Sequence, residues 1–199
     1  DPELQKHADI ALREGLILYD RNHGWRGPIK NIGDELTEKV FSGWKNVLSS
    51  YAKTEVPEGW LLALVLSSEE NQAKIGLISG EMGTIPLKNV KWAQQYLSTN
   101  RKGPEIQKVS EVLKIGDLIY VSRDSENANH YHLQQFPKVS GAFIAMDPHT
   151  GRIMAMSGGF SFRFSQFNRA TQAKRQVGST LKSFIVLKYC GTPAESIAM

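Results

Sequence analysis

Short apolar runs separated by turn residues constrain the fold of this chain most strongly, and they lie between residues 59 and 138. The longest begins at Trp60, directly after Gly59, and continues to Ser67. Runs of about four to eight apolar residues between Gly, Pro and polar clusters are typical of buried strands. We expect five strands, over the ranges 60–67, 73–79, 84–87, 118–122 and 131–137.

The order of these elements predicts a fold. A brief helix is expected around 90–96, between the third and fourth strands, and five short strands with such a helix predict a small closed barrel of the OB type. An open antiparallel sheet is the alternative. The polar stretch 98–108 predicts a mobile surface loop.

Helices are expected before the strands. Residues 2–20 and 34–51 carry apolar side chains at helical spacing. Asp1-Pro2-Glu3 has the order of an N-cap, a first helical position and an acidic first turn. A helix start of this kind at the first residue suggests that the chain is a fragment of something larger.

A hairpin is expected after the strands. Residues 142–146 and 152–156 are apolar, and the turn between them, 147–151, contains Pro and Gly where a tight turn favours them. The fold class is therefore mainly β with helices (α+β).

Composition narrows the function classes. Lys and Arg number 24 against 20 acidic residues, and this net charge of +4 is too mild and too dispersed to indicate a nucleic-acid partner. The single cysteine, Cys190, excludes an internal disulfide. The longest apolar run, 60–66, is too short to span a membrane.

Two polar clusters have competing interpretations. His130 and His132 could share a metal, but no Cys, Asp or further His follows at ligand spacing, so no metal site and no cofactor are expected. The loop 21–28 carries two arginines, His23 and Trp25, which could bind an anion or a sugar. The stronger expectation is that they pack and hydrogen-bond a long connection.

The chemistry-bearing pattern is Ser-x-x-Lys at Ser179 and Lys182, just before the apolar run 184–187. If that run starts a helix, the spacing puts both side chains on one face of its first turn. A neutral Lys amine can then take the proton of the Ser hydroxyl, which alone is a poor nucleophile. This pattern occurs, with S-D-N and K-T-G, in penicillin-binding proteins and class A β-lactamases.

The pattern alone is weak, because residues 42–45 and 50–53 also fit it. Both lie in or at the end of the expected helix 34–51, where nothing favours catalysis. Two S-x-N matches, at 98–100 and 125–127, precede Ser179, whereas that element follows Ser-x-x-Lys in a genuine site. We interpret these matches as chance.

The context of Ser179 closely resembles the start of the transpeptidase domain of class A penicillin-binding proteins. The segments that carry the resemblance are AFIAMDPHTG (142–151), SGG (157–159), FNRATQA (167–173) and RQVGS (175–179). DPELQ (1–5) and DRNHGWRGP (20–28) resemble the linker of the Gram-negative type 1a branch, in which an OB-like domain is inserted before the transpeptidase.

The resemblance implies a division into linker helices (1–58), an OB-like domain (59–138) and the start of a transpeptidase domain (139–199). It also implies that the parent protein polymerises glycan and cross-links stem peptides at the periplasmic face of the inner membrane, held by an N-terminal anchor. Ser179 would be the nucleophile that β-lactams acylate and Lys182 its base, with the Ser179 amide in the oxyanion hole. The OB-like domain would dock a protein, in some members an outer-membrane lipoprotein activator.

Departures from the family pattern are equally informative. Leu181 and Ser183 occupy positions where the family usually has an aromatic residue and Pro. Neither S-x-N nor K-T-G follows Lys182, and residues 188–192 match K-T-G-T only in part. The chain is therefore expected to be catalytically inactive. A lone hairpin plus one helical turn has little to bury, so residues after about 157 are expected to be mobile or to borrow contacts from neighbouring molecules. The alternative function is an OB-fold module that binds protein, glycan or single-stranded nucleic acid.

Overall fold

The computed structural model describes residues 1–33, 40–51, 53–99, 101–174, 176, 178–180 and 182. Its helical elements are α1 (Pro2–Arg21), α2 (Val40–Ser50) and the 3-10 turns η2 (Leu87–Asn89), η3 (Val109–Glu111) and η4 (Gly178–Thr180). Its strands are β1 (Lys30–Asn31), β2 (Trp60–Ser68), β3 (Gln72–Leu77), β4 (Met82–Pro86), β5 (Tyr96–Ser98), β6 (Arg101–Lys102), β7 (Asp117–Arg123), β8 (Tyr131–Gln134), β9 (Phe143–Met146) and β10 (Ile153–Ser157).

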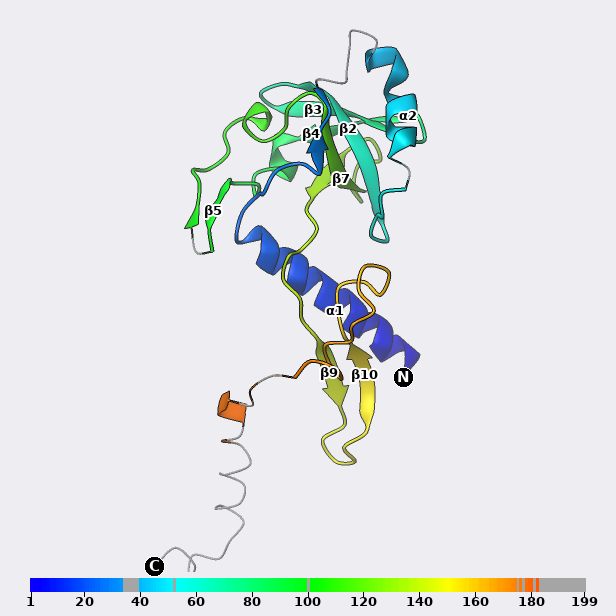
Figure 1. Cartoon of the computed structure of the whole chain (residues 1–199), viewed down its shortest axis with the longest axis vertical. Coiled ribbons are helices and arrows are strands. Elements are labelled where there is room, and N and C mark those ends of the chain that lie inside the picture. The colour runs from blue at the N-terminus through cyan, green and yellow to red at the C-terminus, as the bar shows by residue number, and fades with distance from the viewer. Residues whose placement is uncertain are drawn as a thin grey trace, which may run out of the picture.

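One strongly curved antiparallel sheet lies in the upper part of Figure 1, above α1 and the β9–β10 hairpin. Its order is β1-β7-β2-β3-β4. β1 pairs with the first residues of β7, and β8 pairs with the later residues on the same edge of that strand. The outer strands approach each other where Thr84 of β4 donates its N–H to the carbonyl of Asn129 at 2.9 Å, beside an isolated bridge to His130. All five expected strands are present, and the predicted fold class, mainly β with helices, is confirmed.

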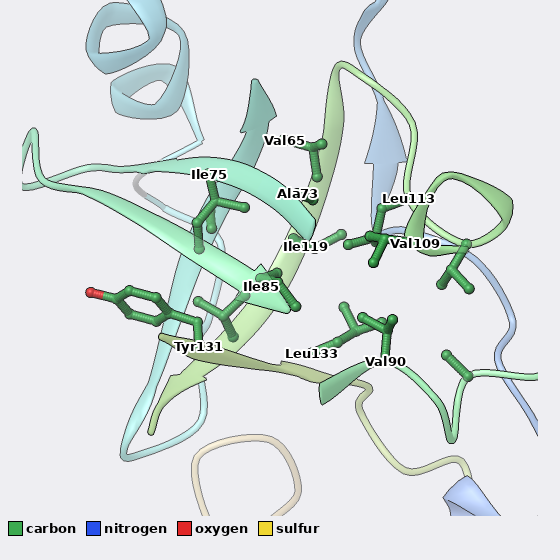
Figure 2. Close-up of a cluster of buried hydrophobic side chains, with 14 of the residues drawn as sticks. Val65, Ala73, Ile75, Ile85, Val90, Val109, Leu113, Ile119, Tyr131 and Leu133 are labelled. Atoms are coloured by element: carbon green, nitrogen blue, oxygen red, sulfur yellow. The ribbon is translucent and has the colours of Figure 1, made fainter. Parts of the chain in front are cut away.

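The continuous apolar run of β2 is explained by burial on both of its faces. Ala63 and Val65 join the cluster inside the curved sheet, whereas Leu64 packs under α2 against Leu48. Figure 2 shows the inner cluster, in which Tyr131 and Leu133 of β8 close one side. The other labelled members are Val65, Ala73, Ile75, Ile85, Val90, Val109, Leu113 and Ile119.

The prediction of a helix around 90–96 is wrong: η2 and the turn residues 90–92 are followed by an extended segment that enters β5. Tertiary pairing overrides the local pattern here. The Asn89 amide donates to the carbonyl of Tyr131 at 2.8 Å, and Gln95 forms a parallel bridge with Trp25. The stretch 98–108 is also not wholly loop, because β6 pairs with β5 as an exposed hairpin.

α1 begins as the sequence predicts, since the Asp1 carboxylate accepts the N–H groups of Glu3 and Leu4 at 2.9 and 3.2 Å. The helix lies along the β9–β10 hairpin (Figure 1). Its Gln5 exchanges two hydrogen bonds with the backbone of Met156, at 2.9 and 3.0 Å. The predicted hairpin is thus confirmed, and α1 connects it to the curved sheet.

The expected helix 34–51 is confirmed over α2, and residues 34–39 lie outside the described residues. Its Ser50 hydroxyl donates to the carbonyl of Val47 at 2.7 Å, so one spare Ser-x-x-Lys match serves only the helix end. In the described residues no helix is long and apolar enough to cross a membrane.

Candidate functional site

Ser179 and Lys182 are both exposed to solvent. Ser179 lies in the short turn η4, and residues 181 and 183–199, with the expected helix after 184, lie outside the described residues. A catalytic base must come within about 3 Å of the hydroxyl it deprotonates, and burial must lower the pKa of a lysine for that role. Because both side chains are exposed to solvent, the buried site that this role requires is not formed around them in the described residues, and the roles of Ser179 and Lys182 stay predictions.

The D-P-H-T-G segment forms the turn between β9 and β10. The Asp147 carboxylate accepts the Thr150 hydroxyl at 2.7 Å and the His149 N–H at 2.9 Å. These hydrogen bonds, that of Thr150 first, hold the pKa of the Asp147 carboxyl below its ordinary value. This motif therefore acts by fixing a tight turn and leaves no free catalytic carboxylate.

The S-G-G and F-N-R-A segments lie against each other and close a loop, 158–169. The Arg169 N–H donates to the carbonyl of Gly158 at 2.9 Å. A side chain at position 158 would place its Cβ 2.1 Å from the Asn168 Oδ1, so only glycine permits this approach. Asn168 in turn exchanges hydrogen bonds with Gln172, from N–H to Oε1 at 2.7 Å and from Gln172 N–H to O at 2.8 Å.

Aromatic residues of this loop pack on the curved sheet. The ring centroid of Phe160 lies 5.8 Å from that of Trp60, at the start of β2, and 5.1 Å from that of Phe136. The ring centroid of Phe164 lies 4.6 Å from that of Phe136. Residues after about 157 were expected to be mobile or to borrow contacts from neighbouring molecules, whereas this loop takes its contacts from its own chain. The sequence reasoning considered only the hairpin and one helical turn as partners, whereas the partner surface comes from β2 and the segment after β8.

The loop 21–28 is engaged within its own chain, so the packing interpretation is confirmed for its arginines. Asp20, which is 2% exposed, accepts Arg26 Nη1 and Nη2 at 3.0 and 2.8 Å. It also accepts the Gln135 amide at 2.8 Å and the Lys138 N–H at 3.0 Å. The segments that enter and leave the curved sheet are thereby held together at one carboxylate.

Arg21 strengthens the same junction. Its Nη2 donates to Gln134 Oε1 at 2.8 Å, and its guanidinium lies 4.8 Å from the Trp92 ring centroid. Burial lowers the pKa of Arg21. Trp92 also contacts Trp25 edge-to-face at 5.8 Å, so the loop and the segment before β5 pack as one unit.

A cleft of about 990 Å³ opens beside this junction. Its walls combine exposed apolar side chains, Tyr96 and Ile115, with the exposed cations Lys114 and Lys138. The remaining lining residues are Trp25, Arg26, Gly27, Pro28, Asn31, Ala93, Gln95, Ile106, Glu111, Val112 and Asp117. A mixed wall of this kind fits a polypeptide segment or a glycan better than a small apolar ligand.

His130 and His132, the pair considered as metal ligands, do not lie in a cluster of metal-binding side chains in the described residues. His132 Nε2 lies 3.4 Å from Asp124 Oδ2, and the pKa of Asp124 is lowered chiefly by the Glu126 N–H. Across the part of the chain that the structure describes, no group of three His, Cys, Asp or Glu side chains could hold a metal ion. Asn127, in one S-x-N match, accepts the N–H of Asn129 at 3.1 Å and shapes a turn.

Comparison with protein families matches residues 25–139 to the penicillin-binding protein OB-like domain. The match spans more than half of the 199 residues. The chain belongs to the penicillin-binding protein OB-like domain family. The matched range includes α2 and the loop before β1, which contribute to the curved sheet or cover it. The division of the chain after residues 58 and 138 stays a prediction.

Curated relatives extend the similarity to both flanks of the OB-like domain. The chain is 38% identical over 187 residues to penicillin-binding protein 1A of Rickettsia typhi, covering 94% of this chain and 21% of that protein. It is 37% identical over 185 residues to penicillin-binding protein 1A of Escherichia coli K12, covering 92% and 21%. The chain therefore spans about a fifth of the length of the curated relatives it matches.

A solved structure agrees with this fold. The crystal structure of penicillin-binding protein 1A from Haemophilus influenzae superposes with a TM-score of 0.66 at 30% identity, over 92% of this chain and 24% of that one. The resemblance that the sequence motifs predicted, to class A penicillin-binding proteins, is confirmed.

Sequence reasoning missed two groups of residues in the OB-like domain and its flanks. Asp20 was part of the recognised linker motif, but nothing marked its carboxylate as a buried junction, and Gln135 carried no signal. Trp60 was expected only as the start of a buried strand, and its contact with Phe160 joins positions far apart in sequence.

Proposed function

We propose that this chain is the linker, OB-like domain and initial transpeptidase segment of a class A penicillin-binding protein of the 1A type. The parent would polymerise glycan and cross-link stem peptides at the periplasmic face of the inner membrane. The observation that carries this proposal is the similarity to penicillin-binding proteins 1A over 92–94% of the chain, with Ser179-x-x-Lys182 in the expected context.

The proposed reaction assigns one role to each residue. The Ser179 hydroxyl oxygen attacks the carbonyl carbon of the D-Ala–D-Ala bond while the Lys182 amine takes its proton. The C–N bond breaks, D-Ala leaves with a proton, and an acyl-Ser179 ester remains. An amine of a neighbouring stem peptide then attacks this ester and restores the hydroxyl. A β-lactam also acylates Ser179, by opening of its ring amide bond, and the resulting ring-opened ester is not passed on to an amine.

The chain itself is proposed to be inactive. Ser179 and Lys182 are exposed, and no S-x-N or K-T-G element follows them in the 199 residues. The oxyanion hole would need a second N–H besides that of Ser179, which the K-T-G strand supplies in this family. Residues 188–192 and Cys190 lie outside the described residues.

The proposed transpeptidation is tested with the full-length protein and lipid II, by chromatographic analysis of the products. Ser179→Ala should lower peptide cross-linking by about a thousandfold or more while glycan polymerisation continues. Cross-linking at the wild-type rate in Ser179→Ala would reject the assignment. Glycan polymerisation is the internal control that the variant is folded.

We also propose that the OB-like domain docks a protein, and that the occupant of its cleft is an outer-membrane lipoprotein activator. The support is the mixed wall formed by Tyr96, Ile115, Lys114 and Lys138. In binding measurements with the 199-residue chain, Tyr96→Ser should weaken the activator by about tenfold. Leu97→Ser is the matched control, because Leu97 is exposed on the same strand and does not line the cleft.

Alternative ligands of the OB-like domain have distinct signatures. If the ligand is a glycan, the 199-residue chain should bind glycan strands in the absence of any protein partner, and Tyr96→Ser should abolish that binding. A single-stranded nucleic acid would bind with an affinity that falls steeply with salt. We expect no such oligonucleotide binding, because the net charge of +4 is small and dispersed.

A further inference from the structure

The loop 158–169 lies between the β9–β10 hairpin and the segment that carries Ser179. Its base is closed by the hydrogen bond from the Arg169 N–H to the Gly158 carbonyl at 2.9 Å. A loop of this length with its ends in contact behaves as one compact unit. Its base lies ten residues before Ser179 in the sequence.

The tip of the loop is held by the OB-like domain. Phe160 contacts Trp60, the first residue of β2, and Phe136, which follows β8. Phe164 contacts Phe136 from the other part of the tip, at 4.6 Å. In Figure 1 the loop rises from the hairpin beside α1 toward the sheet.

Arg13 of α1 completes the contact. Its guanidinium lies 5.3 Å from the Phe160 ring centroid and 5.9 Å from that of Trp60, and it donates to the carbonyl of Glu58. Burial lowers the pKa of Arg13, and a desolvated guanidinium strengthens its contact with an aromatic face. Linker, OB-like domain and transpeptidase segment therefore meet at one aromatic cluster, which we define as Arg13, Trp60, Phe136, Phe160 and Phe164.

We propose that this aromatic cluster positions the Ser179 segment, so that the OB-like domain controls the nucleophile through loop 158–169. Phe160 and Trp60 are positioning residues and touch no substrate. The proposal rests on the proposed transpeptidase function. It gives a partner bound to the OB-like domain a physical route to the reaction, because binding that shifts β2 shifts the loop.

The first test uses the 199-residue chain and no activity. Trypsin cleaves after Arg163, which is exposed within the loop, only when the loop opens. Phe160→Ala should speed this cleavage by about tenfold, since the lost ring contacts and burial held the tip closed. Phe162→Ala is the matched control: Phe162 lies in the same loop but is 74% exposed.

The second test uses the full-length protein and the rate of Ser179 acylation by fluorescent penicillin. Phe160→Ala and Trp60→Ala should each slow acylation by about tenfold, and the double variant should be no slower than either, because both break one contact. Trp60→Phe, which keeps a ring, should restore most of the rate. The melting temperature of the OB-like domain serves as the check that a slow variant is folded.

The outcomes separate two failures. Equal cleavage and equal acylation of Phe160→Ala and Phe162→Ala would overturn the proposed positioning. Additive losses in the double variant would overturn it as well. A wild-type protein that is never acylated would instead contradict the proposed function, and the trypsin result would still report whether the loop is held.

Discussion

Asp20 combines near-complete burial with a full set of donors. Its two carboxylate oxygens accept hydrogen bonds from Arg26, Gln135 and the backbone of Lys138. Buried ion pairs add stability only when the remaining lone pairs are satisfied, and removing one partner leaves a costly unpaired charge. Asp20 therefore binds both the segment that enters the OB-like domain and the segment that leaves it.

Asp20→Ala should lower the free energy of unfolding by about 3–5 kcal/mol, because Arg26 stays buried without its partner. Urea unfolding followed by tryptophan fluorescence measures the change. Glu81→Ala is the matched control: Glu81 pairs with Arg123 at 2.8 Å, but both side chains are more than half exposed, and the expected loss is below about 1 kcal/mol. Equal losses would contradict the role of the junction.

The hairpin turn gives a prediction with a defined pH window. Because hydrogen bonds lower the pKa of Asp147 in the folded state, the ionised carboxylate stabilises the turn above the ordinary value of 3.8. That contribution should be lost as the pH falls through the lower folded pKa. Carboxyl NMR titration should place the Asp147 pKa below 3.8, and Thr150→Val should raise it. An unchanged pKa in Thr150→Val would reject this cause.

At the scale of single elements, glycine lets α2 approach the sheet closely. The Trp44 indole N–H donates to the carbonyl of Leu77 at 3.1 Å, and a Cβ at Gly76 would lie 2.5 Å from the Trp44 Nε1. The α2–β3 packing therefore requires glycine at position 76. Gly43, on α2 itself, has open space around it and no such requirement.

Gly76→Ala should lower the free energy of unfolding by about 1–3 kcal/mol, because the new methyl forces the indole away from β3. Gly43→Ala should raise it by about 0.5–1 kcal/mol, since alanine is the better helix former. Thermal unfolding of both variants compares the two effects. The packing account fails if Gly76→Ala is as stable as the wild-type chain.

The sequence predicts a helix, strand or turn correctly wherever neighbouring residues alone carry the pattern that specifies it. The run from Trp60, the turn at Asp147-Pro148 and the cap at Asp1 all carry their structure in neighbouring residues. The helix expected around 90–96 failed because Asn89 and Gln95 take partners, Tyr131 and Trp25, that are distant in sequence. Phe160 packs on Trp60 for the same reason, so its contact could not be predicted from spacing.

At the scale of the whole molecule, two groups of contacts attach the curved sheet to the segments that flank it in the sequence. The Asp20 junction fixes where the chain enters and leaves the OB-like domain, and the aromatic cluster fixes loop 158–169 to it. Two attachments resist rotation better than one hinge does. Loop 158–169 is therefore held in a defined orientation relative to the OB-like domain.

The most direct test of the account is the site of penicillin attachment. Full-length protein is treated with fluorescent penicillin, digested, and analysed by mass spectrometry. We predict an adduct on the peptide that contains Ser179, its loss in Ser179→Ala, and little or no labelling of the 199-residue chain. An adduct on another residue, none at all, or efficient labelling of the isolated chain would contradict the account.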